Sequence, residues 1–253
     1  MSKTLFITGA TSGFGKAIAQ RFAKEGNNLI ITGRRAERLE NLKQELSKKY
    51  NIKVLTLCFD VRNESEVNDA IKSLPKEWQN IDVLINNAGL ASGLSTLQDG
   101  NTQDWNVMID TNVKGLLYVT HAVLPLLLKS KAPHIINIGS TAGKEVYLKG
   151  NIYCATKHAV NAISKALRID LLEKGVKVTQ ISPGAAETEF SIVRLHGDEE
   201  AAKKLYNGYQ PMVADDIANV VHFATTLPKH LCINDLELTS LAQANSYYTY
   251  KTE

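Results

Sequence analysis

The sequence is short of several features, and each shortage excludes a class of protein. Only three of its 253 residues are cysteines, Cys58, Cys154 and Cys232. They are widely spaced and odd in number, which argues against a disulfide framework and against a metal site, and favours free thiols in a reducing cytoplasm. The net charge is only +3, and no cluster of Lys and Arg is interleaved with aromatic residues. We therefore expect no nucleic-acid partner.

Long hydrophobic runs are also missing. The longest apolar stretch, residues 115–128, is too short to cross a bilayer and contains His121 and Pro125. The first expected strand begins at residue 3 or 4, which leaves no room for a signal or transit peptide. These features predict a cytoplasmic protein with no membrane partner.

Strand-like and helix-like segments alternate along the chain. Short runs rich in β-branched residues occupy residues 3–8, 28–32, 54–59, 81–85, 134–138 and 177–182. Amphipathic stretches lie between or after them, at residues 17–24, 36–49, 64–73, 105–128 and 153–173. This pattern predicts a doubly wound α/β Rossmann fold, a parallel sheet with helices on both faces. We see no repeat or linker, so residues 1–253 are expected to form one domain, with a small substrate loop at about 186–210.

A glycine-rich turn follows the first expected strand. Gly9, Gly13 and Gly15 have the spacing G-x-x-x-G-x-G, and a helical pattern begins directly after them. Glycines at such a turn allow the backbone to approach a pyrophosphate, and the helix N-terminus offers free N–H groups. We expect a nucleotide to bind this turn, including Thr11, Ser12 and Phe14.

The end of the second strand favours NADP over NAD. An NAD site usually has an acidic residue here that binds the ribose 2′-hydroxyl. This chain has Arg34 and Arg35 instead, and its first carboxylate is Glu37. Guanidinium groups suit a 2′-phosphate, and Arg34 is the better candidate of the two. The alternative is that both arginines are ordinary solvated residues at the start of a helix.

A Tyr and a Lys four residues apart suggest acid–base chemistry. Tyr153 and Lys157 lie one turn apart on the same face of an expected helix. A nearby cation favours the phenolate and is expected to lower the pKa of the Tyr153 hydroxyl. Ser140, thirteen positions upstream, can hold the substrate oxygen. By itself this pair is common on surface helices, so its meaning depends on the other motifs.

Together these motifs resemble the short-chain dehydrogenase/reductase family. They occur in the family's order and spacing: Thr8–Gly15, Asp60-Val61, Asn86-Asn87-Ala88-Gly89, Asn112, Ser140, Tyr153-x-x-x-Lys157 and Pro183-Gly184. The resemblance covers residues 3 to about 190. It implies that the protein is an enzyme that transfers hydride between a substrate and NADP.

The resemblance also implies a role for each residue. Tyr153 would be the proton donor or base, Ser140 would bind the substrate oxygen, and Lys157 would bind the nicotinamide ribose. Asn112 would interrupt a helix so that its backbone holds a water linked to Lys157. The remaining cofactor contacts would come from Asp60, Val61, Asn86, Asn87, Ala88, Gly89, Pro183, Gly184 and Thr188.

The segment from residue 183 to 198 resembles one branch, the NADP-dependent 3-hydroxy acid dehydrogenases, which are also described as serine 3-dehydrogenases or L-allo-threonine dehydrogenases. Such a substrate needs a cationic anchor for its carboxylate, and Arg194 is the candidate. It could equally be a surface or inter-subunit arginine, in which case Tyr147 and Lys149 could replace it. Lys144-Glu145 and the tail from residue 242 depart from the branch.

Two other functions remain open at this stage. The protein could reduce larger carbonyl compounds, such as a sugar, steroid or xenobiotic ketone. It could also bind NADP without turnover, although such proteins usually lose Tyr or Lys from the triad. The family resemblance further implies a homo-oligomer, with a tetramer favoured over a dimer, assembled through the helices at residues 105–128 and 153–173.

Overall fold

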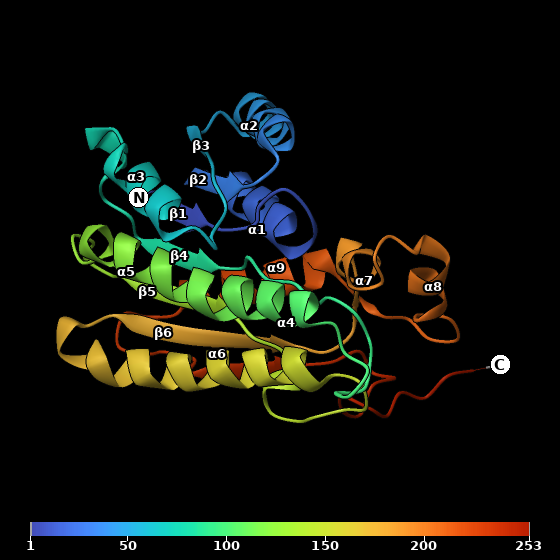
Figure 1. Cartoon of the computed structure of the whole chain (residues 1–253). Helices are drawn as coiled ribbons and strands as arrows, with labels where there is room; N and C mark the ends of the chain where they lie inside the picture. The colour runs from blue at the N-terminus through green and yellow to red at the C-terminus, as the bar shows by residue number, and fades with distance from the viewer. Residues whose placement is uncertain (1, 253) are drawn as a thin grey trace.

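A computed structural model describes residues 2–252 of the chain. Seven parallel strands form one sheet in the order β3-β2-β1-β4-β5-β6-β9. The strands are β1 (Thr4–Ile7), β2 (Asn28–Gly33), β3 (Val54–Cys58), β4 (Val83–Asn86), β5 (His134–Ile138), β6 (Lys177–Pro183) and β9 (Asp235–Leu238). The predicted doubly wound Rossmann fold is confirmed (Figure 1).

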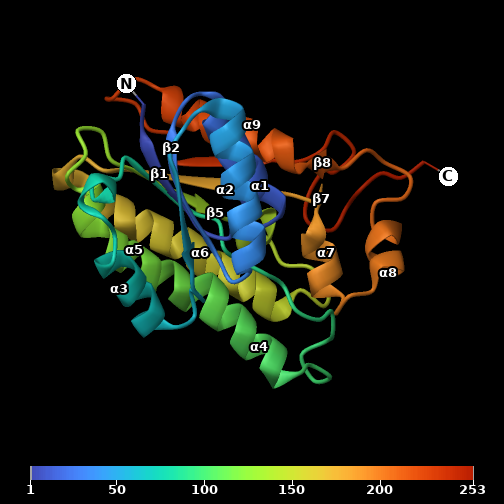
Figure 2. The same cartoon turned by 90° about the horizontal axis from the view of Figure 1, so that it is seen from above.

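Helices cover both faces of this sheet. One face carries α1 (Gly13–Lys24), α2 (Ala36–Tyr50) and α9 (Ala214–Thr226). The other carries α3 (Glu64–Lys72), α5 (Leu116–Leu127) and α6 (Asn151–Asp170). Figure 2 shows α9 on one side of the strands and α3, α5 and α6 on the other.

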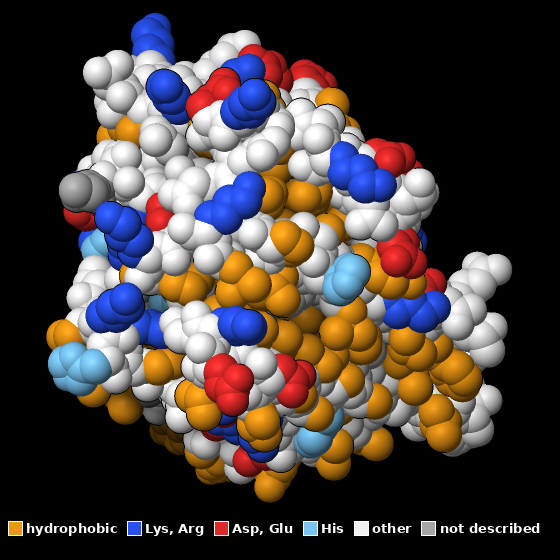
Figure 3. Space-filling view, turned by 90° about the vertical axis from the view of Figure 1, so that its left-hand side faces the viewer, with side chains coloured by type: hydrophobic (Ala, Val, Ile, Leu, Met, Phe, Trp, Pro, Cys, Tyr) orange, Lys and Arg blue, Asp and Glu red, His pale blue; other side chains and the backbone are white. Residues whose placement is uncertain are grey.

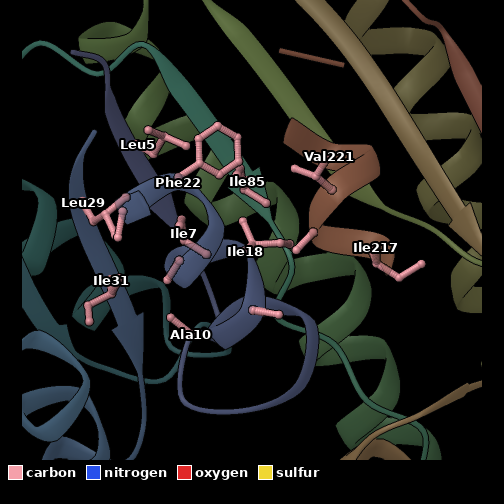
Figure 4. Close-up of a cluster of buried hydrophobic side chains, with 14 of the residues drawn as sticks. Leu5, Ile7, Ala10, Ile18, Phe22, Leu29, Ile31, Ile85, Ile217 and Val221 are labelled. Atoms are coloured by element: carbon pink, nitrogen blue, oxygen red, sulfur yellow. The ribbon is translucent and has the colours of Figure 1, made fainter. Parts of the chain in front are cut away.

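The alternation of side chains along each strand builds two cores. In β1, Leu5 and Ile7 point into the cluster with α1 and α9, and Phe6 points into the opposite cluster with α3 and α5. All three are fully buried, as expected for a strand with helices on both faces. Figure 4 shows the first cluster, to which α1 contributes Phe22, α9 contributes Val221 and β1 contributes Ile7.

The expected long helix at residues 105–128 contains a local change of helix type. It begins as α4 (Thr102–Ile109), passes through a π-helical turn at Asp110–Gly115, and continues as α5. A π-turn widens the helix and disturbs the regular hydrogen-bond ladder, and such turns are frequent at functional sites.

The C-terminal quarter holds structure that the sequence patterns did not reveal. Both α9 and the seventh strand, β9, were missed. The expected substrate loop at residues 186–210 folds into β7 (Ala186–Glu187), α7 (Glu189–Arg194) and α8 (Glu199–Lys204), and β7 pairs with β8 (Met212–Val213). Figures 1 and 2 show α7 and α8 beyond the edge at which the sheet strands end.

Among residues 2–252, no helix is both long enough and apolar enough to span a membrane.

Candidate active site

A cavity of about 830 Å³ opens at the carboxyl ends of the strands. It spans the point where β1 has β2 on one side and β4 on the other, which is where ligands bind in open α/β sheets. All of the predicted site residues line it except Gly15, Asn86, Asn112 and Lys149. Those that do are Gly9, Thr11, Ser12, Gly13, Phe14, Arg34, Arg35, Asp60, Val61, Asn87, Ala88, Gly89, Ser140, Tyr147, Tyr153, Lys157, Pro183, Gly184, Thr188 and Arg194.

The glycine turn forms one end of this cavity. Gly9 has a left-handed backbone (φ 66°), a conformation that costs a residue with a side chain about 1–2 kcal/mol. Gly15 faces the carbonyl of Gly9 so closely that a Cβ would lie 2.3 Å from that oxygen. Ser12, the N-cap of α1, makes no side-chain cap hydrogen bond. The first N–H groups of α1 are therefore available to an anion, and the turn fits a pyrophosphate.

The loop after β4 is fastened to this turn. The Thr8 hydroxyl accepts hydrogen bonds from the backbone N–H groups of Asn87 and Ala88, both at 2.9 Å. The Asn87 amide in turn donates to the Thr8 carbonyl at 2.8 Å. Asn86, by contrast, points into the sheet, where its amide donates to Thr120 and Asn137, and it does not line the cavity. Asn87, Ala88 and Gly89 are thus the part of this motif that lines the cavity.

Two arginines lie where a 2′-phosphate would bind. The Arg34 side chain is 57% exposed, and its Nη1 lies 3.9 Å from the carboxylate of Asp60. Arg35 donates to the hydroxyls of Thr11 and Ser12 in the glycine turn. Burial tends to raise the pKa of Asp60, but hydrogen bonds from Arg62 outweigh it and lower that pKa. The cationic groups at this end fit NADP, because the guanidinium fork matches a phosphate.

Ser140, Tyr153 and Lys157 meet in the middle of the cavity. Ser140 ends the loop after β5 with an extended backbone (φ −172°), and its hydroxyl accepts the N–H of Ala142 at 3.1 Å. Tyr153 and Lys157 lie on α6 and are 9% and 6% exposed. The Lys157 ammonium donates to the carbonyl of Ile138 at 2.9 Å, and it lies 5.9 Å from the centre of the Tyr153 ring.

The protonation of this pair differs from the sequence-based expectation. Burial raises the pKa of the Tyr153 hydroxyl, with a further increase from Tyr147, while Ser140 and Arg194 favour the ionised form. Burial also lowers the pKa of Lys157 to about 8. The expected lowering of the Tyr153 pKa by Lys157 is therefore wrong, because desolvation dominates both groups. The Tyr153 hydroxyl is held in its neutral form.

Asn112 lies in the π-helical turn, behind the cavity wall. Its side chain accepts the N–H of Leu90 at 2.9 Å and donates to the Leu90 carbonyl and to the Thr156 hydroxyl. These bonds tie the turn to the loop after β4 and to α6. The helix interruption expected at Asn112 is thus present, and the side chain itself is used to hold neighbouring elements together.

Arg194, the last residue of α7, places its guanidinium group beside Tyr153. The Nη1 of Arg194 donates to the Tyr147 hydroxyl at 2.9 Å. The guanidinium carbon lies 5.4 Å from the centre of the Tyr147 ring and 5.6 Å from that of Tyr153. Its Nε is buried without an acceptor, and no carboxylate of residues 2–252 forms an ion pair with it. Arg194 and Tyr147 therefore act together, whereas Lys149 does not line the cavity.

Sequence reasoning missed several residues of the cavity wall. They come from the π-turn, α7, the chain around α8 and the C-terminal tail: Thr111, Glu189, Phe190, Tyr206, Tyr209, Gln243 and Ser246. The ring of Phe190 packs edge-on against Tyr153 at 5.6 Å. The Gln243 amide oxygen accepts the N–H of Ala185 at 2.8 Å. No local sequence motif predicts these residues, because their positions depend on how the last third of the chain packs against the rest of the protein.

The two departures from the branch pattern also have a place in the structure. Lys144, just after Ser140, pairs with Asp235 at 3.0 Å and Glu237 at 2.8 Å, both on β9. Glu145 accepts the backbone N–H of Ser246 at 2.8 Å. Lys144-Glu145 thus fastens the segment after Ser140 to β9 and to the C-terminal tail.

Comparisons with known proteins agree with this geometry. Residues 3–197 match the short chain dehydrogenase family model. Serine 3-dehydrogenase of Rhizobium radiobacter is 48% identical over 244 residues, 96% of each chain. An NADP-dependent 3-hydroxy acid dehydrogenase of Salmonella typhi is 48% identical over 241 residues, 95% of this chain and 96% of its own. Sulfoacetaldehyde reductase 2 of Chromohalobacter salexigens is 46% identical over 249 residues, 98% of each.

A solved structure is similar over the same length. The closed form of a serine dehydrogenase complexed with NADP+ aligns with a TM-score of 0.91 and 45% identity, covering 99% of this chain and 100% of that one. The fold, the glycine turn and the grouping of Ser140, Tyr153 and Lys157 lead to the same result as the family match: this chain belongs to the short-chain dehydrogenase family.

Proposed function

We propose that this protein is an NADP-dependent oxidoreductase that interconverts a small 3-hydroxy acid and its 3-oxo acid or semialdehyde. The observation that carries the proposal is the position of Arg194 beside the ring of Tyr153, where no carboxylate in the described part of the chain pairs with it. A guanidinium binds a carboxylate strongly and with defined geometry. The relatives named for serine and for 3-hydroxy acids support the same substrate class.

The cofactor site supports NADP(H). The glycine turn and the free N-terminus of α1 suit the pyrophosphate, and Arg34 and Arg35 suit the 2′-phosphate. The similar structure that contains NADP+ points the same way. When bound, the nicotinamide supplies the hydride donor or acceptor, and the protein supplies orientation and the path of the proton.

Three side chains carry the proton chemistry. In reduction, the neutral Tyr153 hydroxyl donates its proton to the substrate oxygen as that oxygen gains negative charge. The Ser140 hydroxyl donates a hydrogen bond to the same oxygen and holds it in place. Lys157, buried beside Tyr153, binds ribose hydroxyls and favours the phenolate that remains. In oxidation the same groups work in reverse, and Tyr153 accepts the proton from the alcohol.

Asn112 and the π-turn hold in place the end of the proton path that lies farthest from the substrate. The Asn112 side chain is bound to Leu90 and Thr156, so the widened turn stays open next to α6. A backbone carbonyl freed by the π-turn suits a water that links Lys157 to solvent.

Arg194 selects the substrate by its charge. In a 3-hydroxy acid the carboxylate is two carbons from the carbon that carries the hydroxyl, so it can lie on Arg194 while the hydroxyl lies between Ser140 and Tyr153. A sulfonate presents the same charge at a similar distance. The sulfoacetaldehyde reductase among the relatives therefore favours reduction of a small sulfonated aldehyde as a second candidate.

The test is a spectrophotometric assay with NADP and with NAD, in both directions. Oxidation would be measured with L-serine, L-allo-threonine, 3-hydroxyisobutyrate and 3-hydroxypropanoate, and reduction with malonic semialdehyde and sulfoacetaldehyde. We expect turnover of the carboxylic acids with NADP and little with NAD. Turnover of sulfoacetaldehyde alone would favour the second candidate. Activity only on large uncharged ketones would contradict an acid substrate, and NADPH binding without turnover would contradict an enzyme.

We also propose a homo-oligomer, with a tetramer favoured, located in the cytoplasm. Large apolar side chains are exposed on and next to the helices expected at the interface: Leu117 and Leu128 at α5, and Ile169 and Leu172 at the end of α6. Figure 3 shows one face of the molecule with hydrophobic side chains gathered over its lower part. Light scattering of the purified protein would give the mass, and a monomer would contradict the proposal. The three free cysteines suit a reducing compartment.

A further inference from the structure

Glu189 connects the substrate region to the 2′-phosphate end of the cavity. It is the first residue of α7, and its carboxylate reaches across to the start of α2. There it accepts from Arg35 Nη1 at 3.2 Å and from Arg38 Nη1 at 3.0 and 3.1 Å. Glu189 and Arg35 both line the cavity. A carboxylate thus lies in the cationic end of the site.

All three guanidinium nitrogens of Arg35 donate hydrogen bonds. Its Nε and Nη2 donate to Thr11 Oγ1 at 3.1 and 2.7 Å, and Nη2 also donates to Ser12 Oγ at 2.9 Å. Its Nη1 donates to Glu189. Thr11 and Ser12 are neutral, so within residues 2–252 Glu189 is the one charged partner that a phosphate must compete with for this guanidinium.

Glu189 is ionised at neutral pH. Its partial burial tends to raise the pKa of the carboxyl, but hydrogen bonds from Arg35 and Arg38 outweigh this effect and lower that pKa. The group therefore carries a full negative charge where the dianionic 2′-phosphate would arrive. Close like charges repel, and at this partly exposed surface the repulsion is moderate.

We propose that Glu189 is a specificity-determining residue for the cofactor, an internal carboxylate that competes with the 2′-phosphate of NADP(H) for Arg35. The inference rests on the proposed use of NADP. Its effect is to weaken the binding of NADP(H) without changing that of NAD(H), which has no 2′-phosphate. Arg38 contacts both oxygens of Glu189, so the carboxylate keeps a partner when the phosphate takes Arg35.

The test compares the Glu189→Gln variant with the unmutated protein in fluorescence titrations of NADPH and NADH. Gln keeps the size and an acceptor oxygen but removes the charge. We expect the dissociation constant for NADPH to fall about 2- to 5-fold, the size of one partly exposed charge interaction, and that for NADH to change less than about 1.5-fold. The matched control is Glu187→Gln, which removes the same charge two residues earlier, where no arginine is paired with it.

Three results would overturn the inference. These are unchanged or weaker NADPH binding by a Glu189→Gln variant whose unfolding temperature matches that of the parent, an equal gain for NADH, and an equal gain in Glu187→Gln. Failure of the unmutated protein to bind NADPH would be a different outcome, because it would contradict the proposed function itself and with it this inference.

Discussion

Arg194 at the end of α7 and Tyr147 in the loop before α6 are 47 positions apart, yet the guanidinium donates a 2.9 Å hydrogen bond to the phenol oxygen. This bond turns the arginine towards Tyr153, whose ring centre lies 5.6 Å from it. Burial raises the pKa of the Tyr147 hydroxyl, and Arg194 opposes that increase without cancelling it. Tyr147 therefore stays neutral and leaves the positive charge of Arg194 free for an anionic substrate.

Replacing Arg194 by Gln should weaken the binding of acidic substrates. A hydrogen bond to a charged group contributes about 1.5–3 kcal/mol, so we expect KM for a 3-hydroxy acid to rise roughly 10- to 100-fold, with a smaller change in kcat. Initial rates over a range of substrate concentrations measure both. The exposed Lys149, replaced by Gln, is the control. If Lys149→Gln shows the larger loss, Arg194 is not the anchor.

Replacing Tyr153 by Phe should abolish proton transfer while leaving the cofactor site intact. Acid–base groups of this kind contribute about 10²–10⁴ in rate, so kcat should fall by that factor. The dissociation constant for NADPH, from fluorescence titration, should stay within about threefold, because the removed hydroxyl is one contact among many. Tyr247→Phe, in the exposed tail, should have full activity. A Tyr153→Phe enzyme that retains its rate would contradict the assigned role.

Replacing Gly15 by Ala should prevent cofactor binding. Its Cβ would lie 2.3 Å from the Gly9 carbonyl oxygen and 2.5 Å from the Asn87 amide, so the glycine turn must shift, at a cost of about 1–3 kcal/mol in stability. The control is Gly26→Ala. Gly26 has a positive φ (74°), unlike Gly15, and has open space around it, so Gly26→Ala should lose about 1–2 kcal/mol. Both variants should melt earlier in calorimetry, but only Gly15→Ala should lose affinity for NADPH. Equal affinities would show that the turn does not hold the cofactor.

Acid should destabilise the protein through His134, at the opposite edge of the sheet. Burial, with smaller contributions from Lys177 and Lys3, lowers the pKa of His134 from 6.5 to about 3. The unfolded chain therefore binds a proton between these values and the folded chain does not, so stability is lost as the pH falls below 6.5. At pH 5 the loss from this group is about 2 kcal/mol.

The His134→Gln variant tests this assignment. Gln keeps a polar group near Thr179, which the His134 ring contacts at 2.8 Å, but it does not titrate. Urea unfolding at pH 7 and pH 5 should show that the parent loses about 2 kcal/mol more than the variant over this interval. Parallel losses in the two proteins would mean that His134 is protonated in the folded state or that other groups dominate.

The sequence by itself determined the sheet and most of the site. Alternating apolar segments predicted six of the seven sheet strands, because a strand covered on both faces needs a continuous apolar run. Motif residues followed those strands directly, as Ser140 follows β5 and Gly184 follows β6. Parallel strands end at one edge, so residues far apart in the chain were expected to meet there, and they line one cavity.

Only the tertiary structure decided the parts that depend on distant contacts. The partners of Gln243 and Ser246 lie 58 and 101 positions away, and no local pattern encodes such pairings. The competition between Glu189 and a phosphate depends on α7 reaching α2, across more than 150 positions. The protonation of Tyr153 is the clearest case. Spacing placed Lys157 beside it, but burial set the pKa of both groups, because desolvation depends on everything packed around them and not on the neighbouring residues in the chain.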